Sequence, residues 1–156
     1  MRLATLAIQA EAWLQEELGA ERALLELLRR AESAARTGSG TELECCRGDF
    51  DGWLGANGAR ESRRTALLEK FGVALAVPTR AVTLTKLVER LRTAHIDTQR
   101  LDGLRAELRE VATTVARTSR HLAAMAHYHR GLLEELCQSI CAESGRPDGH
   151  LVDARG

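Results

Sequence analysis

The sequence is poor in aromatic residues and in proline, and it has no excess of charge of either sign. Only 3% of its 156 residues are aromatic, two are proline, and 22 basic side chains balance 22 acidic ones. The balanced charge gives the chain no general attraction to nucleic acid. The apolar residues are mostly leucine, alanine and valine, which favours helices packed on helices over a sheet or an aromatic-lined pocket. We therefore expect an all-α protein.

Long apolar segments are missing as well. No run approaches the roughly 18 apolar residues that a membrane span needs. The first residues carry acidic side chains from Glu11 onward and lack a small-residue cleavage site, unlike a secretory signal. We therefore expect a cytoplasmic protein without membrane insertion, in which the four cysteines stay reduced thiols.

The short motifs of common catalytic sites are absent too. The chain has no glycine-rich phosphate loop after a strand, no GxSxG and no HExxH, and no carboxylate pair is set in a predicted pocket. This pattern predicts neither an enzyme nor a cofactor. Arg60, Arg63 and Arg64 form a small basic patch beside acidic residues, which indicates a solvated face rather than an anion site.

The cysteines and histidines leave a metal site open as an alternative. Cys137 and Cys141 are four residues apart on one helical face, and His129 lies two turns before them. Cys45 and Cys46 could supply further ligands from another helix. The spacing matches no recognised zinc pattern, so the simpler interpretation makes Cys137 and Cys141 small apolar packing residues.

The most regular feature that is present is a heptad pattern between Leu101 and Ile140. It holds for about five heptads without a proline, and it predicts a long helix that needs a partner along its length. A helix of roughly 40 residues is about 60 Å long, so we expect an elongated molecule. The a and d positions are Leu101, Leu104, Leu108, Val111, Val115, Thr118, Leu122, Met125, His129, Leu132 and Leu136.

The remaining apolar periodicity predicts three helices before the long one. We expect helices at about 2–36, 42–71, 83–94 and 98–142, which form one domain over residues 1–142. A flexible tail follows at 143–156. The fold class is thus all-α, an elongated antiparallel helical bundle or coiled-coil hairpin with a long C-terminal helix.

Glycine and capping residues set the expected helix boundaries. The turn at Thr37–Thr41 predicts that the first two helices form a hairpin. Four glycines between Gly48 and Gly58 predict that the second helix is weak or bent in its first half. Gly72 is the expected C-cap of that helix, and Thr83 is the expected N-cap of the third.

The order of these segments matches a known arrangement. A leucine-rich helix comes first, a second helix ends in ALLEKFG, and TLTKLVERL precedes RLDGLRAELREVATTVARTSRHLAAMAHYHRGLLEEL and a tail that ends in GHLVDARG. This order resembles the FlgN-type flagellar export chaperones over most of the chain. The tail, with a glycine and a proline before Leu151 and Val152, is the part most similar to that family.

The resemblance implies a function and a set of binding residues. FlgN-type chaperones are cytosolic helical proteins that hold hook–filament junction proteins until the flagellar export apparatus secretes them. The C-terminal helix and tail would bind this cargo, and Cys141 stands where relatives carry an aromatic residue that contacts the export gate. The implied cargo-binding residues are Leu122, Met125, Tyr128, Leu132, Leu133, Leu136, Ile140, Leu151 and Val152.

Three alternatives remain open at this stage. Leu122, Met125 and Leu132 lie on the heptad positions, so they fit closure of the chain's own bundle equally well. The whole chain also fits a generic coiled-coil adaptor or self-assembling structural protein. The third alternative is a metal-dependent or redox-active helical bundle that uses His129, Cys137 and Cys141.

Overall fold

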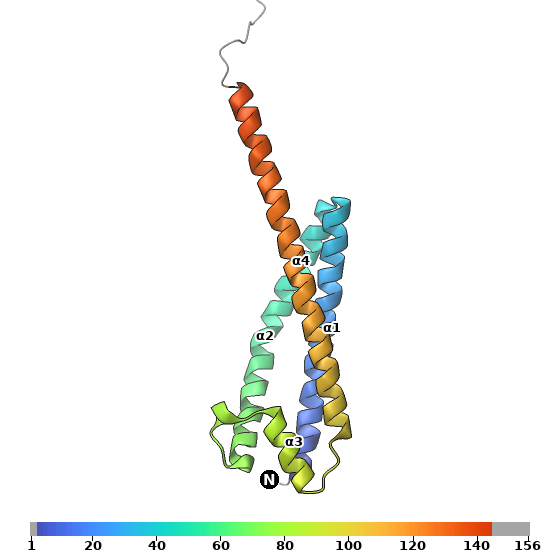
Figure 1. Ribbon diagram of the computed structural model, residues 1–156, viewed down its shortest axis with the longest axis vertical. Coiled ribbons are helices and arrows are strands. Elements are labelled where there is room, and N and C mark those ends of the chain that lie inside the picture. Colours follow the sequence, from blue (N-terminus) through green and yellow to red (C-terminus); the bar gives the residue numbers. More distant parts are fainter. Residues whose placement is uncertain (1–2, 145–156) are drawn as a thin grey trace, which may run out of the picture. The chain divides into compact units, whose positions relative to one another are not determined.

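The computed structural model describes residues 3–144, with the side chains of residues 3–140, and this part of the chain contains helices and no strand. The predicted all-α class and the long C-terminal helix are thus confirmed. The chain divides into two units, Met1–Ser119 and Arg120–Gly156, and contacts between residues are concentrated within each unit. The elements are α1 (Leu3–Thr37), α2 (Gly40–Leu75), the 3-10 helix η1 (Thr79–Ala81), α3 (Leu84–Thr93) and α4 (Gln99–Ser144), as drawn in Figure 1.

The helices α1 and α2 form the antiparallel hairpin that the turn residues predict (Figure 1). Gly38 adopts a φ of 69°, a left-handed conformation that glycine tolerates without a steric cost. The Ser39 hydroxyl accepts a hydrogen bond of 3.4 Å from the backbone N–H of Glu42 and caps α2. Beyond the turn, Arg30 pairs with Glu42 at 2.9 Å and with Asp49 at 2.8 Å, which holds the two helices in register.

The main core lies at the opposite end of this hairpin. The first turns of α1 supply an apolar stripe in which buried residues recur every three or four positions, as the sequence pattern predicts. This stripe packs against the end of α2, against α3 and against the start of α4. The buried members of the cluster are Leu6, Ala7, Ala10, Leu14, Leu67, Phe71, Leu87, Val88, Leu91 and Leu101.

The middle of α2 contributes little to any core. No residue between Cys46 and Leu67 is buried, and the apolar side chains of Leu43 and Leu54 are exposed. The chain is nevertheless helical through all four glycines from Gly48 to Gly58. The predicted helix is therefore present, although its middle has few buried contacts.

The end of α2 differs from the sequence expectation. Gly72 is not the C-cap, because the helix continues to Leu75 and Ala76 takes the left-handed position with a φ of 54°. The backbone N–H of Val77 donates to the carbonyl of Gly72 at 3.0 Å, and that of Ala76 donates to Val73 at 3.3 Å. These two bonds define a Schellman motif with alanine in place of the usual glycine. Gly72 is instead buried where a Cβ would lie 3.0 Å from the carbonyl oxygen of Val77.

The short helix α3 begins and ends near the predicted residues. The Thr83 hydroxyl accepts from the backbone N–H of Lys86 at 3.2 Å, so the predicted N-cap is confirmed. His95 adopts a φ of 54° after the helix, and Ile96 donates its N–H to the carbonyl of Leu91 at 3.0 Å. This second Schellman motif turns the chain toward α4.

The second unit is described from Arg120 to the end of α4 at Ser144, and this segment is helical throughout. None of its described side chains is buried, whereas the first unit contains every buried residue of residues 3–140. Among the described residues, no helix has a segment that is both long enough and apolar enough to cross a membrane.

Hydrogen exchange tests the predicted weakness of α2. We expect the amides between Gly48 and Gly58 to exchange much faster than those between Leu104 and Leu122, because four glycines and a lack of buried neighbours lower the cost of local opening. Native-state exchange followed by mass spectrometry or NMR measures both segments in one sample. Equal protection of the two segments would contradict the prediction.

The Schellman motif at Ala76 predicts a stabilising substitution. An L-residue in the left-handed conformation costs about 1 kcal/mol, so Ala76→Gly should raise the free energy of unfolding by about 0.5 to 1 kcal/mol after the added flexibility of the unfolded chain is subtracted. Ala59→Gly, at an exposed helical position of α2, is the control and should lower it by about 1 kcal/mol. Urea unfolding measures both, and a loss of stability at position 76 would contradict the assigned conformation.

Candidate functional site

A row of exposed apolar side chains runs along the second unit's part of α4. Tyr128, Leu132, Leu133, Leu136 and Ile140 are between 39% and 65% exposed. Leu122 and Met125, which precede them, are half-buried. We call the seven residues together the α4 stripe. Leu151 and Val152, the two remaining residues of the predicted site, lie outside the described residues.

Helical geometry places the members of the α4 stripe on one face. At 100° per residue they fall within an arc of about 140°, with Tyr128 at one edge and Leu133 at the other. His129 lies within the same arc, and it is exposed, with its ring 6.0 Å from the ring of Tyr128. Arg130 and Glu134 form an ion pair of 2.8 Å outside the arc. The segment is therefore amphipathic, with an apolar face that solvent reaches.

The heptad pattern thus has two structural outcomes. Leu101 is 1% exposed and Val115 is 9% exposed, so the first part of the pattern is covered by the chain itself. His129, Leu132 and Leu136 continue the same spacing and are exposed. The expected partner along the whole length is therefore found only for the first part of α4 within the described residues.

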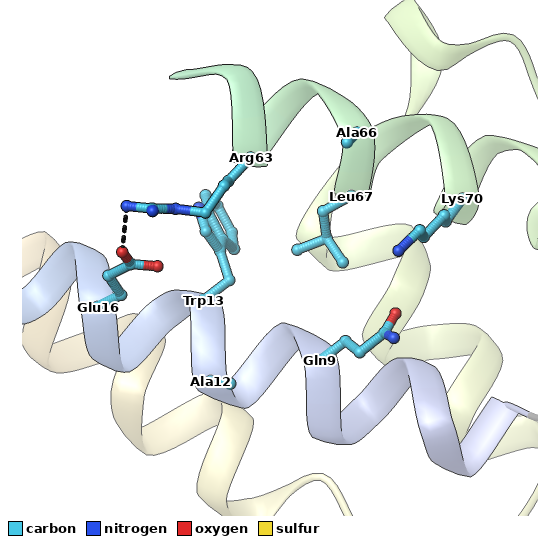
Figure 2. A pocket seen from close by; sticks show the side chains of 8 residues that line it. All are labelled: Gln9, Ala12, Trp13, Glu16, Arg63, Ala66, Leu67 and Lys70. Carbon is cyan, nitrogen blue, oxygen red and sulfur yellow. Dashed lines mark hydrogen bonds and ion pairs between the residues drawn. The ribbon is translucent and has the colours of Figure 1, made fainter. Parts of the chain in front are cut away.

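A groove between α1 and α2 is a second feature, and no local sequence pattern indicates it. It has a volume of about 360 Å³, and side chains from both antiparallel helices line it (Figure 2). At one end Gln9 faces Lys70, and at the other end Glu16 forms an ion pair with Arg63. Ala12, Trp13, Ala66 and Leu67 line the groove between these ends, and the Trp13 ring rises from α1 beside Arg63. We call this feature the α1–α2 groove.

The two tryptophans have different environments. The indole N–H of Trp13 donates to Glu17 at 3.1 Å, and the ring lines the α1–α2 groove. The indole N–H of Trp53 donates to the carbonyl of Ala20 at 3.1 Å. Arg60 lies 4.6 Å from the centre of the Trp53 ring, which is a cation–π contact. Trp53 therefore joins α1 to α2, whereas Trp13 contributes to a surface.

The predicted basic patch does not form one charged surface. Arg60 covers Trp53, Arg63 pairs with Glu16, and Arg64 pairs with Glu61 at 3.4 Å. Each guanidinium group thus has its own partner, in agreement with the interpretation as a solvated face.

The described residues contain no group of three or more histidine, cysteine, aspartate or glutamate side chains that could hold a metal ion. Cys45 and Cys137 are exposed, so the expectation that Cys137 is a packing residue is wrong. Cys46 is buried, and this burial raises the pKa of its thiol, although the charge of Arg30 opposes the shift. A thiol with a raised pKa is a poor nucleophile at neutral pH.

One carboxyl group beside the Trp53 contact has a shifted pKa. Burial raises the pKa of Glu21, the nearby charge of Glu17 raises it further, and Arg60 lowers it in part. The ionised form of Glu21 is therefore less favourable in the folded protein than in the unfolded chain.

The comparisons with known proteins add no relative. No family model, curated protein or solved structure matches this chain.

The raised pKa of Glu21 predicts that replacing this residue by glutamine stabilises the protein in a pH-dependent way. When folding raises the pKa of a carboxyl group, the protonated group adds most to the free energy of unfolding below its unfolded pKa. This contribution is lost as the pH rises through the folded pKa. Glu21→Gln should therefore raise the thermal midpoint at pH 7, and the difference from the parent should vanish below about pH 4. Glu69→Gln, at an exposed position of α2, is the control. An equal or lower midpoint for Glu21→Gln at pH 7 would contradict the assignment.

Proposed function

We propose that the protein is a cytoplasmic chaperone of the flagellar export system that holds hook–filament junction proteins before their secretion. It acts by binding, without catalysis, and the α4 stripe is its contact surface for an amphipathic helix of the cargo. The chain then delivers this cargo to the export apparatus.

The exposed α4 stripe is the observation that carries the proposal. Five large apolar side chains within one amphipathic segment are in contact with water, although each gains about 2 kcal/mol when it is buried. An apolar helical face at successive turns is the surface that helix-in-groove and helix-on-helix recognition uses. Binding of a second amphipathic helix would remove this face from water and would cover the matching face of the cargo.

The location of the core supports the same proposal. The buried residues among 3–140 all lie at or before Val115, so the fold does not need the α4 stripe for its own stability. A binding surface that is separate from the core can be exposed before cargo binds and after cargo leaves. The resemblance of the helix order to FlgN-type chaperones supports the choice of cargo.

Two variants test the proposed contact surface. Leu133→Ser with Ile140→Ser removes two side chains of the stripe, and deletion of residues 143–156 removes the predicted tail anchors Leu151 and Val152. Both variants should keep the parent's thermal midpoint and most of its helix signal, because neither touches the core. Both should bind a helical fragment of a hook–filament junction protein more weakly, by at least about tenfold for the double variant, which loses on the order of 2 kcal/mol at each site.

Calorimetric titration against an N-terminal and a C-terminal fragment of the junction protein measures this effect. Ala123→Ser with Ala124→Ser, outside the arc of the α4 stripe, is the matched control and should bind as the parent does. Unchanged binding of both test variants, or unfolding of the tail deletion, would contradict the assignment of this surface. If the double variant instead changes only the sedimentation of the protein alone, the heptad spacing serves self-association, and the coiled-coil adaptor replaces the chaperone.

A further inference from the structure

Asn57 is the only asparagine in the sequence, and Gly58 follows it directly. Both residues are exposed in the middle of α2, in the segment between Cys46 and Leu67 that buries no residue. The side-chain oxygen of Asn57 accepts a hydrogen bond of 3.3 Å from Arg60, which lies about one turn further along the same helix. Solvent therefore reaches both residues of the Asn–Gly pair.

An asparagine that precedes glycine can react with its own main chain. The backbone nitrogen of Gly58 loses its proton to hydroxide and attacks Cγ of Asn57, so a C–N bond forms. The bond from Cγ to the side-chain nitrogen breaks, ammonia leaves, and a five-membered succinimide ring results. One water molecule then opens either carbonyl of the ring, which gives aspartate or isoaspartate. Glycine permits the attack because it has no Cβ beside the attacking nitrogen and few restrictions on its backbone angles.

An intact helix opposes this reaction. Each backbone N–H inside an α-helix donates to the carbonyl four residues earlier, so the Gly58 nitrogen is not available for the attack. The helical backbone angles also hold that nitrogen away from Cγ of the preceding side chain. The reaction therefore needs local opening of α2, and its rate is the rate of the open chain multiplied by the open fraction.

The middle of α2 has the properties that allow such opening. Gly48, Gly52 and Gly55 precede the pair, and each favours the open chain over the helix by about fourfold relative to alanine. A Cβ at any of these glycines would meet no atom within 4 Å, so no close approach of another helix requires them. The segment can therefore open while the buried cluster at the end of α2 stays folded.

Two Asp–Gly pairs provide a comparison within the same chain. An aspartate before glycine forms the same succinimide, with loss of water in place of ammonia. Asp51–Gly52 lies in the exposed segment of α2. Asp102–Gly103 lies near the start of α4, where the aspartate carboxylate accepts from Arg92 at 2.8 Å and from Thr98 at 3.0 Å. The two pairs share their intrinsic chemistry and differ in how firmly the surrounding structure holds them.

We propose that Asn57–Gly58 is a self-modification site, which in the folded protein converts through a succinimide to aspartate and isoaspartate at a rate set by local opening of α2. Isoaspartate adds one carbon to the main chain, so helical hydrogen bonds across position 57 are lost. The reactants are this chain and water. The site therefore depends neither on the α4 stripe nor on the chaperone function.

Mass spectrometry of the full chain, aged in mildly alkaline buffer, tests the proposal. Trypsin releases Gly48–Arg60, which contains Asn57 and Asp51, and Leu101–Arg105, which contains Asp102. Asn57 should convert at a rate within about 100-fold of that of the chain unfolded in guanidinium, because opening of α2 costs much less than global unfolding. A mixture of aspartate and isoaspartate at position 57 identifies the succinimide, since direct hydrolysis of the amide gives aspartate alone. Isoaspartate should also accumulate faster at Asp51 than at Asp102.

Glycine variants separate the chemistry of the pair from the opening of the helix. Gly58→Ala adds a side chain beside the attacking nitrogen and strengthens the helix, so it should slow the conversion at least about tenfold. Gly55→Ala leaves the Asn–Gly pair intact and makes opening less favourable, so it should slow the conversion by about threefold to fivefold. In guanidinium, Gly55→Ala should react as the parent does. Gly131→Ala makes the same change on α4 and should have no effect.

Three results would each overturn the proposal. The first is conversion of Asn57 in the folded chain that is slower than the stated limit, or that gives aspartate alone. The second is equal accumulation of isoaspartate at Asp51 and Asp102. The third is an equal rate in Gly55→Ala and Gly131→Ala, with circular dichroism verifying that both variants are folded.

Discussion

The fold depends on one apolar contact region, in which the first turns of α1 meet the end of α2, α3 and the start of α4. Leu6, Leu14 and Phe71 are almost completely removed from water there. This region includes residues of all four helices, and the two Schellman turns come shortly after its members Phe71 and Leu91. The far end of the α1–α2 hairpin lies outside this cluster, although Leu28, Ala34 and Cys46 are buried there. Ion pairs of Arg30 and the hydrogen bond between Trp53 and Ala20 also join the two helices.

This unequal distribution of apolar contacts has a consequence for α2. An α-helix gains most of its stability in a protein from the burial of one face, because helix propensity alone is weak. Between Cys46 and Leu67, both of which are buried, the helix buries no residue and contains four glycines. Its contacts with α1 in this range are polar or aromatic, such as the Trp53 hydrogen bond and the Arg63 ion pair. The α1–α2 groove lies where this sparse packing meets the core, so its walls are ordered by Leu67 while its surface remains open.

The sequence was sufficient for the features that depend on local patterns. Apolar periodicity predicted the helices, the glycine and capping residues of Thr37–Thr41 predicted the hairpin turn, and Thr83 was predicted as an N-cap. The end of α2 was predicted wrongly, because glycine is the usual signal for a left-handed cap, whereas alanine gives none. Glycine fits position 72 because of a tertiary contact instead, since a Cβ there would lie 3.0 Å from the backbone oxygen of Val77. The groove was also outside the reach of local patterns, because Gln9 and Lys70 become neighbours only when α1 and α2 pair.

Periodicity along α4 illustrates the remaining limit of sequence reasoning. Leu101 and Leu132 both belong to the a and d series of the heptad pattern, yet the first is buried and the second is exposed. A heptad pattern states that a face is apolar, and it does not state whether the covering surface belongs to the same chain. Leu101 belongs to a cluster whose other buried members lie on α1, α2 and α3. For Leu132 the described chain offers no equivalent cover, so the apolar free energy of this segment remains available for binding.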